Sequence, residues 1–120
     1  MTEAQPEAAC LFCKIIQKKI PSLIVYEDDR ALAFADISPQ APTHLLIIPK
    51  RHISRLADLQ SGDEELMAHL FVVVQKLAKE NGLLESGFRT VINSGEDAGQ
   101  TVFHLHVHLM GGRVFEWPPG

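Results

Sequence analysis

The chain has 120 residues, 46% of them hydrophobic, and its 15 acidic and 11 basic side chains give a net charge of -4. This composition predicts one folded domain and excludes a disordered or low-complexity protein. It also argues against a nucleic-acid partner, because such proteins gather basic side chains against phosphates. No apolar run is long enough to span a bilayer, and the acidic N-terminus does not resemble a signal peptide. We therefore expect a cytoplasmic protein with no membrane partner.

The hydrophobic pattern predicts two helices and five strands in one α+β domain. Residues 1–9 are expected to form a flexible tail, followed by a single domain over 10–120. A short helix is predicted over 11–19, and a main helix starts at Ser61 in a capping box and ends at Asn81. Strands are predicted at 23–27, 31–35, 45–48, 88–93 and 101–110. This order favours a mostly antiparallel sheet packed against the main helix.

The last predicted strand carries histidines at alternate positions, His104, His106 and His108. Alternate residues of a strand share a face, so these imidazoles would line one face and apolar side chains the other. An exposed polar face, a metal site and a site for a phosphate-bearing substrate are the three interpretations. Two of the histidines could share a metal ion, but residues four apart on a strand lie about 13 Å apart. The glycine-bearing loop at 94–100 leads into this strand, where its N–H groups could bind a phosphate.

Two other segments add to this pattern. Residues 104–110 alternate histidine with apolar side chains, residues 36–53 run through Asp-Ile-Ser-Pro-Gln-Ala-Pro-Thr-His into an apolar strand, and residues 117–120 read Trp-Pro-Pro-Gly. Together they resemble the histidine triad (HIT) superfamily, and its Hint branch in particular, over about residues 10–120. The resemblance implies a HIT-like fold, in which a five-stranded antiparallel sheet carries one main helix and a short N-terminal helix. It also implies a homodimer that extends the sheet, with the C-terminal tail contacting the partner.

The resemblance further implies a purine nucleoside phosphoramidase. Such an enzyme hydrolyses the P–N bond of adenosine or guanosine 5'-phosphoramidates and releases a nucleoside monophosphate and an amine. His106 would be the nucleophile that forms a nucleotidyl-histidine intermediate, flanked by His104 and His108 and supported by His44 from a neighbouring strand. Histidine rather than glutamine at position 108 favours hydrolysis over nucleotidyl transfer. The nucleotide-binding positions implied are Asp36, Ile37, Asn93, Gly99, Gln100 and Thr101, together with His106 and His108.

Cys10 and Cys13 form a C-x-x-C pair, which is half of a zinc site. By resemblance to HIT proteins that carry zinc, the other two ligands would be His44 and His104. A zinc ion held in this way would be structural, and the chemistry would not require it. Two small buried thiols without a metal are the alternative. His52 and His69 are given no role in either interpretation.

Three other functions stay open. The protein could be a dinucleoside polyphosphate hydrolase, although the Trp-Pro-Pro-Gly ending argues against that branch. It could be a purine nucleotide-binding or regulatory module whose catalysis is incidental. It could also be a zinc-binding adaptor, in which the His106 side chain would be dispensable.

Overall fold

The fold is α+β, as predicted, and was obtained as a computed structural model that describes residues 9–120. The tail predicted at 1–9 therefore lies outside the described residues, except for Ala9. The elements are α1 (Leu11–Ile16), β1 (Ile24–Glu27), β2 (Ala31–Ala35), β3 (Thr43–Pro49), η1 (Leu56–Asp58), α2 (Glu64–Glu80), β4 (Phe88–Val91) and β5 (Val107–Gly111). Within residues 9–120, every helix is too short or too polar to cross a membrane.

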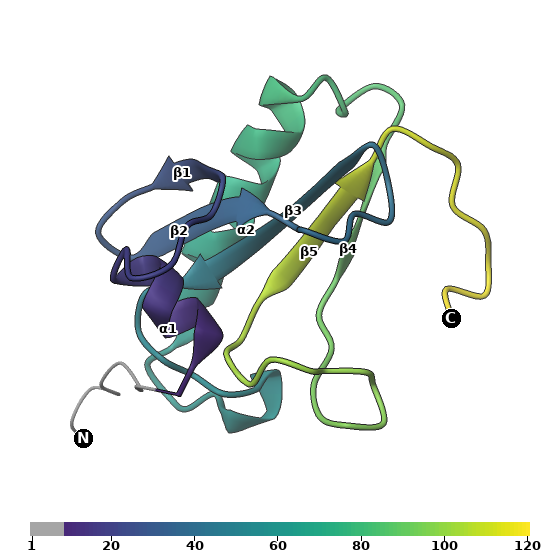
Figure 1. Ribbon diagram of the computed structural model, residues 1–120. Helices are drawn as coiled ribbons and strands as arrows, with labels where there is room; N and C mark the ends of the chain where they lie inside the picture. Colours follow the sequence, from purple (N-terminus) through teal and green to yellow (C-terminus); the bar gives the residue numbers. More distant parts are fainter. Residues whose placement is uncertain (1–8) are drawn as a thin grey trace.

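The five strands form one antiparallel sheet in the order β1-β2-β3-β5-β4. The two helices lie on opposite faces of this sheet (Figure 1). Strand β2 shows why: its alanines Ala31 and Ala33 pack in the core under α2, and Leu32 and Phe34 point to the face that α1 covers. The alternation of small and large side chains therefore gives the sheet two apolar faces.

The last strand is shorter than the sequence predicts. A strand was expected over 101–110, but β5 begins only at Val107. The reason is that the preceding backbone makes other hydrogen bonds. The Leu105 N–H donates to the carbonyl of Ile53 at 2.6 Å, and the carbonyl of His104 accepts from the His106 ring at 2.7 Å. The apolar side chains between the histidines still pack in the core under α2.

Helix α2 begins at Glu64, so the capping box predicted at Ser61 is wrong. Asp63 precedes the helix instead, and its carboxylate accepts a hydrogen bond from the Gln60 N–H at 2.8 Å. The Glu64 carboxylate accepts from the Gly62 N–H at 2.8 Å. These bonds close a turn before the helix. Strands β1, β3 and β4 differ from their predicted bounds by one or two residues at their ends.

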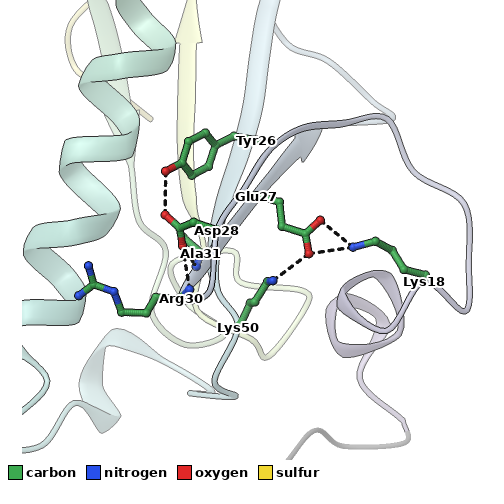
Figure 2. Close-up of polar contacts among 7 residues, drawn as sticks. All are labelled: Lys18, Tyr26, Glu27, Asp28, Arg30, Ala31 and Lys50. Carbon is green, nitrogen blue, oxygen red and sulfur yellow. Dashed lines mark hydrogen bonds and ion pairs between the residues drawn. The ribbon is translucent and has the colours of Figure 1, made fainter.

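Helix α1 ends at Ile16, earlier than predicted, because the chain turns at Lys18, which has a φ of +61°. The Lys18 ammonium then donates to Glu27 of β1 at 2.9 Å, and Lys50 lies 2.8 Å from the same carboxylate (Figure 2). These contacts hold the segment at 17–22 against the edge of the sheet. That segment forms part of the cavity described next.

Candidate active site and metal centre

A cavity of about 390 Å³ lies between α1, the sheet and the loop before β5. Its polar lining comes mostly from residues far apart in the sequence, and these are Ser22, Asp36, Asn93, Thr101, His106 and His108. Its apolar lining comes mainly from α1, the following loop and β2, and includes Leu11, Phe12, Ile15, Ile20, Phe34 and Leu46. A flat apolar ligand joined to a phosphate would match these two kinds of surface.

The ring of His106 is held in one tautomer. Its Nδ1 lies 2.7 Å from the carbonyl oxygen of His104. A carbonyl only accepts, so Nδ1 carries the proton and Nε2 keeps its lone pair. Burial lowers the pKa of His106, against the raising effects of the His104 carbonyl and of Asp36. The residue is therefore a neutral imidazole whose free nitrogen can act as a nucleophile in this cavity.

The ring of His108 is held in the complementary tautomer. The Gln40 N–H donates to Nδ1 of His44 at 3.0 Å, so His44 carries its proton on Nε2. That nitrogen lies 2.9 Å from Nδ1 of His108, which must accept. Burial lowers the pKa of His108 to about 4, with His106 and His44 adding to the effect. His108 is thus neutral with its proton on Nε2, and the centroids of its ring and the His106 ring lie 5.0 Å apart.

Asp36, His44 and His108 also bring potential metal-ligand atoms within 4.8 Å of one another. The tautomers argue against a metal there, because His44 Nε2 carries a proton and His44 Nδ1 is occupied by Gln40. One oxygen of Asp36 accepts from the Ser38 N–H at 2.8 Å, and the other lies 3.4 Å from His44 Nε2. We interpret the hydrogen bonds from the Gln40 N–H through His44 to His108 as the chain that orients His108, with the Asp36 carboxylate beside His44.

A second cluster brings Cys10, Cys13, His52 and His104 together, also with donor atoms within 4.8 Å of one another. Nε2 of His104 lies 2.8 Å from the carbonyl of Pro49, so Nδ1 keeps the lone pair. This Nδ1 lies 3.4 Å from the Cys10 sulfur and 3.6 Å from the Cys13 sulfur. Nδ1 of His52 lies 3.3 Å from the Cys13 sulfur. Two sulfurs and two imidazole nitrogens are a donor set that tetrahedral zinc accepts.

The electrostatics of His104 also fit a metal ligand. Burial lowers the pKa of His104 to about 4, although the Pro49 carbonyl opposes the effect. A metal requires the neutral imidazole, so no proton has to be displaced from this ring at pH 7. The second hydrogen bond, to a backbone carbonyl, is the usual support for a ligating histidine.

The sequence analysis expected His44 in this cluster, but the structure places His52 beside the two cysteines and His104 instead. Strands β3 and β5 are antiparallel, and His44 pairs with Met110, six positions along from His104. The chain that follows Pro49 is instead the part that reaches His104. The proximity of His52 to His104 follows from the register of β3 and β5, and the sequence alone does not give that register.

The nucleotide-binding positions implied by the resemblance largely come together. The cavity is lined by Asp36, Ile37, Asn93, Gly99, Thr101, His106 and His108. Gln100 does not line it. Its buried side chain donates to the carbonyls of Ser54 at 2.8 Å and Val102 at 3.0 Å, so it holds the loop. His104 also faces the cysteines rather than the cavity, and reaches the proposed nucleophile through its carbonyl.

The chain was compared with models of known protein families. The HIT domain matches residues 17–115. The chain belongs to the HIT domain family. This HIT protein is similar to a HIT family hydrolase from Legionella pneumophila, whose crystal structure matches with a TM-score of 0.91. The two sequences are 54% identical, and the match covers 92% of this chain and 99% of the other. It is also similar to a histidine triad nucleotide-binding protein from Candida albicans, with 34% identity and a TM-score of 0.78 over 92% and 83% of the two chains.

A third relative bears on the cysteine cluster. The HIT protein is 50% identical to a 14 kDa zinc-binding protein from Zea mays over 116 residues, which cover 95% of this chain and 90% of the maize protein. The donor set of Cys10, Cys13, His52 and His104 is compatible with a zinc ion in this chain as well.

Proposed function

We propose that this HIT protein is a purine nucleoside phosphoramidase that works through a nucleotidyl-histidine intermediate on His106. The observation that carries the proposal is the pair of tautomers in one cavity. His106 offers a lone pair, and the neighbouring His108 offers an N–H. A nucleophile beside a hydrogen-bond donor is what displacement at a phosphoryl centre requires.

In the first step, Nε2 of His106 attacks phosphorus and the P–N bond breaks. The nucleotidyl-imidazole gains positive charge, which the His104 carbonyl stabilises by accepting the Nδ1–H. The Nε2–H of His108 stabilises the negative phosphoryl oxygens. The leaving nitrogen takes up a proton from solvent and departs as an amine, and we assign the relay of that proton to the Thr101 hydroxyl because it lines the same cavity. In the second step water attacks phosphorus and loses a proton, the bond between phosphorus and Nε2 of His106 breaks, and the monophosphate and free His106 are formed.

The rest of the cavity supports a nucleoside. Phe12, Phe34 and Leu46 offer apolar surface to a purine base. Ile37 lines the cavity and is 95% exposed, which fits a side chain at the mouth that a base would cover. Asp36 would accept hydrogen bonds from the ribose, and Asn93 and the backbone of Gly99 would contact the phosphate.

The proposal is tested by measuring AMP release from adenosine 5'-phosphoramidate with the wild type and with His106→Ala, in the presence of a chelator. We expect turnover by the wild type and a loss of at least about 10³-fold in the variant, because the nucleophile is gone. AMP binding is measured in parallel. Binding without turnover by the wild type would contradict the proposal and favour a nucleotide-binding module. Faster turnover of diadenosine polyphosphates would favour the other hydrolase branch.

We also propose that one structural zinc ion is held by Cys10, Cys13, His52 and His104. When bound, the ion would supply no reactive group and would act as a cross-link. The residues themselves come from α1, from the chain after β3 and from the chain before β5, so they join three segments that are remote in the sequence. Neither Cys10 nor Cys13 is in a disulfide, which fits the reducing cytoplasm that we propose for the protein.

We further propose that two copies pair along β4. Strand β4 is at the edge of the sheet, where backbone groups are available to another strand. A second cavity, of about 590 Å³, separates β4 from the C-terminal segment, in which Val114 and Trp117 are 84% and 82% exposed. A second chain would cover these apolar groups. Sedimentation velocity should give the mass of two chains at micromolar concentration, and a single-chain mass would refute the dimer.

A further inference from the structure

One polar side chain interrupts the apolar wall that α1 and the following loop give to the cavity. From residue 11 to residue 34, the lining side chains are all apolar except that of Ser22. Ser22 is half-buried, and within residues 9–120 no hydrogen bond joins its hydroxyl to another side chain or to the backbone. A hydroxyl in such a wall is available to a ligand.

The pairing of β1 with β2 brings Ser22 close to Asp36. Ile24 pairs with Phe34, and the carbonyl of Leu23 accepts from the Ala35 N–H at 3.0 Å. Continued by one residue, this register puts Ser22 beside Asp36, on the same face as Ile24 and Phe34. Paired residues of antiparallel strands have Cβ atoms about 5 Å apart. Both side chains line the cavity, so they form a polar pair on one wall.

The two groups differ in what they can offer. The Asp36 carboxylate only accepts hydrogen bonds, and it already accepts from Ser38 and lies near His44. A ligand hydroxyl both donates and accepts. Once it has donated to Asp36, its own oxygen still needs a donor when it leaves water. The Ser22 hydroxyl, which lines the same cavity, can supply that hydrogen bond.

We propose that Ser22 and Asp36 together recognise the vicinal diol of a ribose, so that Ser22 determines the preference for ribonucleotides over deoxyribonucleotides. The inference rests on the proposed function, because it assumes that a nucleotide occupies this cavity. Ser22 takes no part in breaking the P–N bond. It is a specificity residue, and its removal should affect binding more than turnover.

The test is the Kd of the zinc-loaded wild type and of Ser22→Ala for AMP, 2'-deoxy-AMP and 3'-deoxy-AMP. We expect Ser22→Ala to raise the Kd for AMP by about three- to tenfold, the value of one hydrogen bond. The Kd for the analogue that lacks the contacted hydroxyl should stay unchanged, because there is no bond left to lose. Ser22→Thr keeps a hydroxyl and should restore most of the difference. With adenosine 5'-phosphoramidate, KM should rise and kcat should change less than twofold.

Two controls keep the outcome interpretable. Ser61→Ala removes an exposed serine hydroxyl that does not line the cavity, in the turn before α2, and should leave all three Kd values unchanged. The thermal midpoint of each variant shows that it is folded. Equal weakening of all three nucleotides in Ser22→Ala, or no weakening, would overturn the role of Ser22 while leaving the proposed function intact. A wild type that binds none of the three would overturn the proposed function and this inference with it.

Discussion

Backbone groups fix the tautomers of three of the histidines, and the tautomer of His108 is fixed in turn by His44. The His104 carbonyl fixes the proton of His106, the Gln40 N–H fixes that of His44, and the Pro49 carbonyl fixes that of His104. A backbone carbonyl can only accept and a backbone N–H can only donate, so each partner selects one tautomer of the neutral ring. The alternating histidine pattern predicts which side chains share a face but not which nitrogen carries the proton. The position of the proton depends on hydrogen-bond partners that are remote in the sequence, such as Pro49 for His104.

The chain from Gln40 through His44 to His108 leads to a prediction about His44. In His44→Ala, Nδ1 of His108 loses its hydrogen-bond donor, and the His108 proton is no longer confined to Nε2. We expect kcat for adenosine 5'-phosphoramidate to fall by roughly 10- to 100-fold, with a smaller change in KM, because an oriented donor to the phosphoryl group is lost. ¹⁵N chemical shifts of the His108 ring would show the change of tautomer directly.

Gln40→Ala is the matched control for this variant. The donor to His44 is the backbone N–H of residue 40, which alanine keeps, so turnover should stay within about threefold of the wild type. If Gln40→Ala lost as much activity as His44→Ala, the effect would come from the turn as a whole and not from the hydrogen bond to His108.

At the scale of elements, periodicity located β2 without error, because alternating alanines and large apolar residues leave no other register that fills both faces. It failed where the chain makes local hydrogen bonds instead of sheet or helix bonds, as at the start of α2 and before β5. A similar limit explains why the sequence analysis gave His52 no role. His52 lies beyond the end of β3, and only the antiparallel pairing with β5 shows that this end meets His104.

The β1–β2 turn is joined to α2 through Asp28. Its carboxylate accepts from the Tyr26 hydroxyl and from the N–H groups of Arg30 and Ala31 at 2.7 to 2.8 Å (Figure 2). Nε2 of His69 on α2 lies 2.6 Å from it. Burial alone would raise the pKa of Asp28, but these hydrogen bonds lower it well below the usual range.

The lowered pKa of Asp28 gives the sign of a pH effect. The folded state binds the Asp28 proton less tightly than the unfolded chain, in which the pKa is about 3.9. The stability that Asp28 contributes is therefore fully present above about pH 5 and is lost as the pH falls below about 4. We expect Asp28→Asn to lower the free energy of unfolding by about 1 to 3 kcal/mol at pH 7. The difference from the wild type should shrink toward pH 3, as measured by urea unfolding. A difference that is constant with pH would contradict this origin.

For the molecule as a whole, the metal cluster and the cavity share one wall. The ring of Phe12 packs edge-on against His104 on one side and His106 on the other, with centroids 6.0 and 5.1 Å apart. Cys10 precedes α1 as its N-cap and Cys13 lies within it, so α1 belongs to both sites. A cross-link at the cysteines would therefore stabilise the apolar wall that we propose for the base, although none of the four residues of the metal cluster lines the cavity beside His106 and His108.

This shared wall gives a prediction that separates the two histidines considered for the metal. His52→Ala removes a ligand and should reduce the zinc content from one ion per chain to a small fraction, measured by elemental analysis of purified protein. The thermal midpoint should fall by about 10 °C or more. Loss of a structural metal costs several kcal/mol of stability, and each kcal/mol shifts the midpoint by about 4 °C in a domain of this size. A chelator should lower the midpoint of the wild type by a similar amount and have little effect on His52→Ala.

His44→Ala should keep its zinc, since His44 contacts His108 and not the cysteines. Loss of zinc from His44→Ala together with retention in His52→Ala would instead restore the ligand set expected from the sequence.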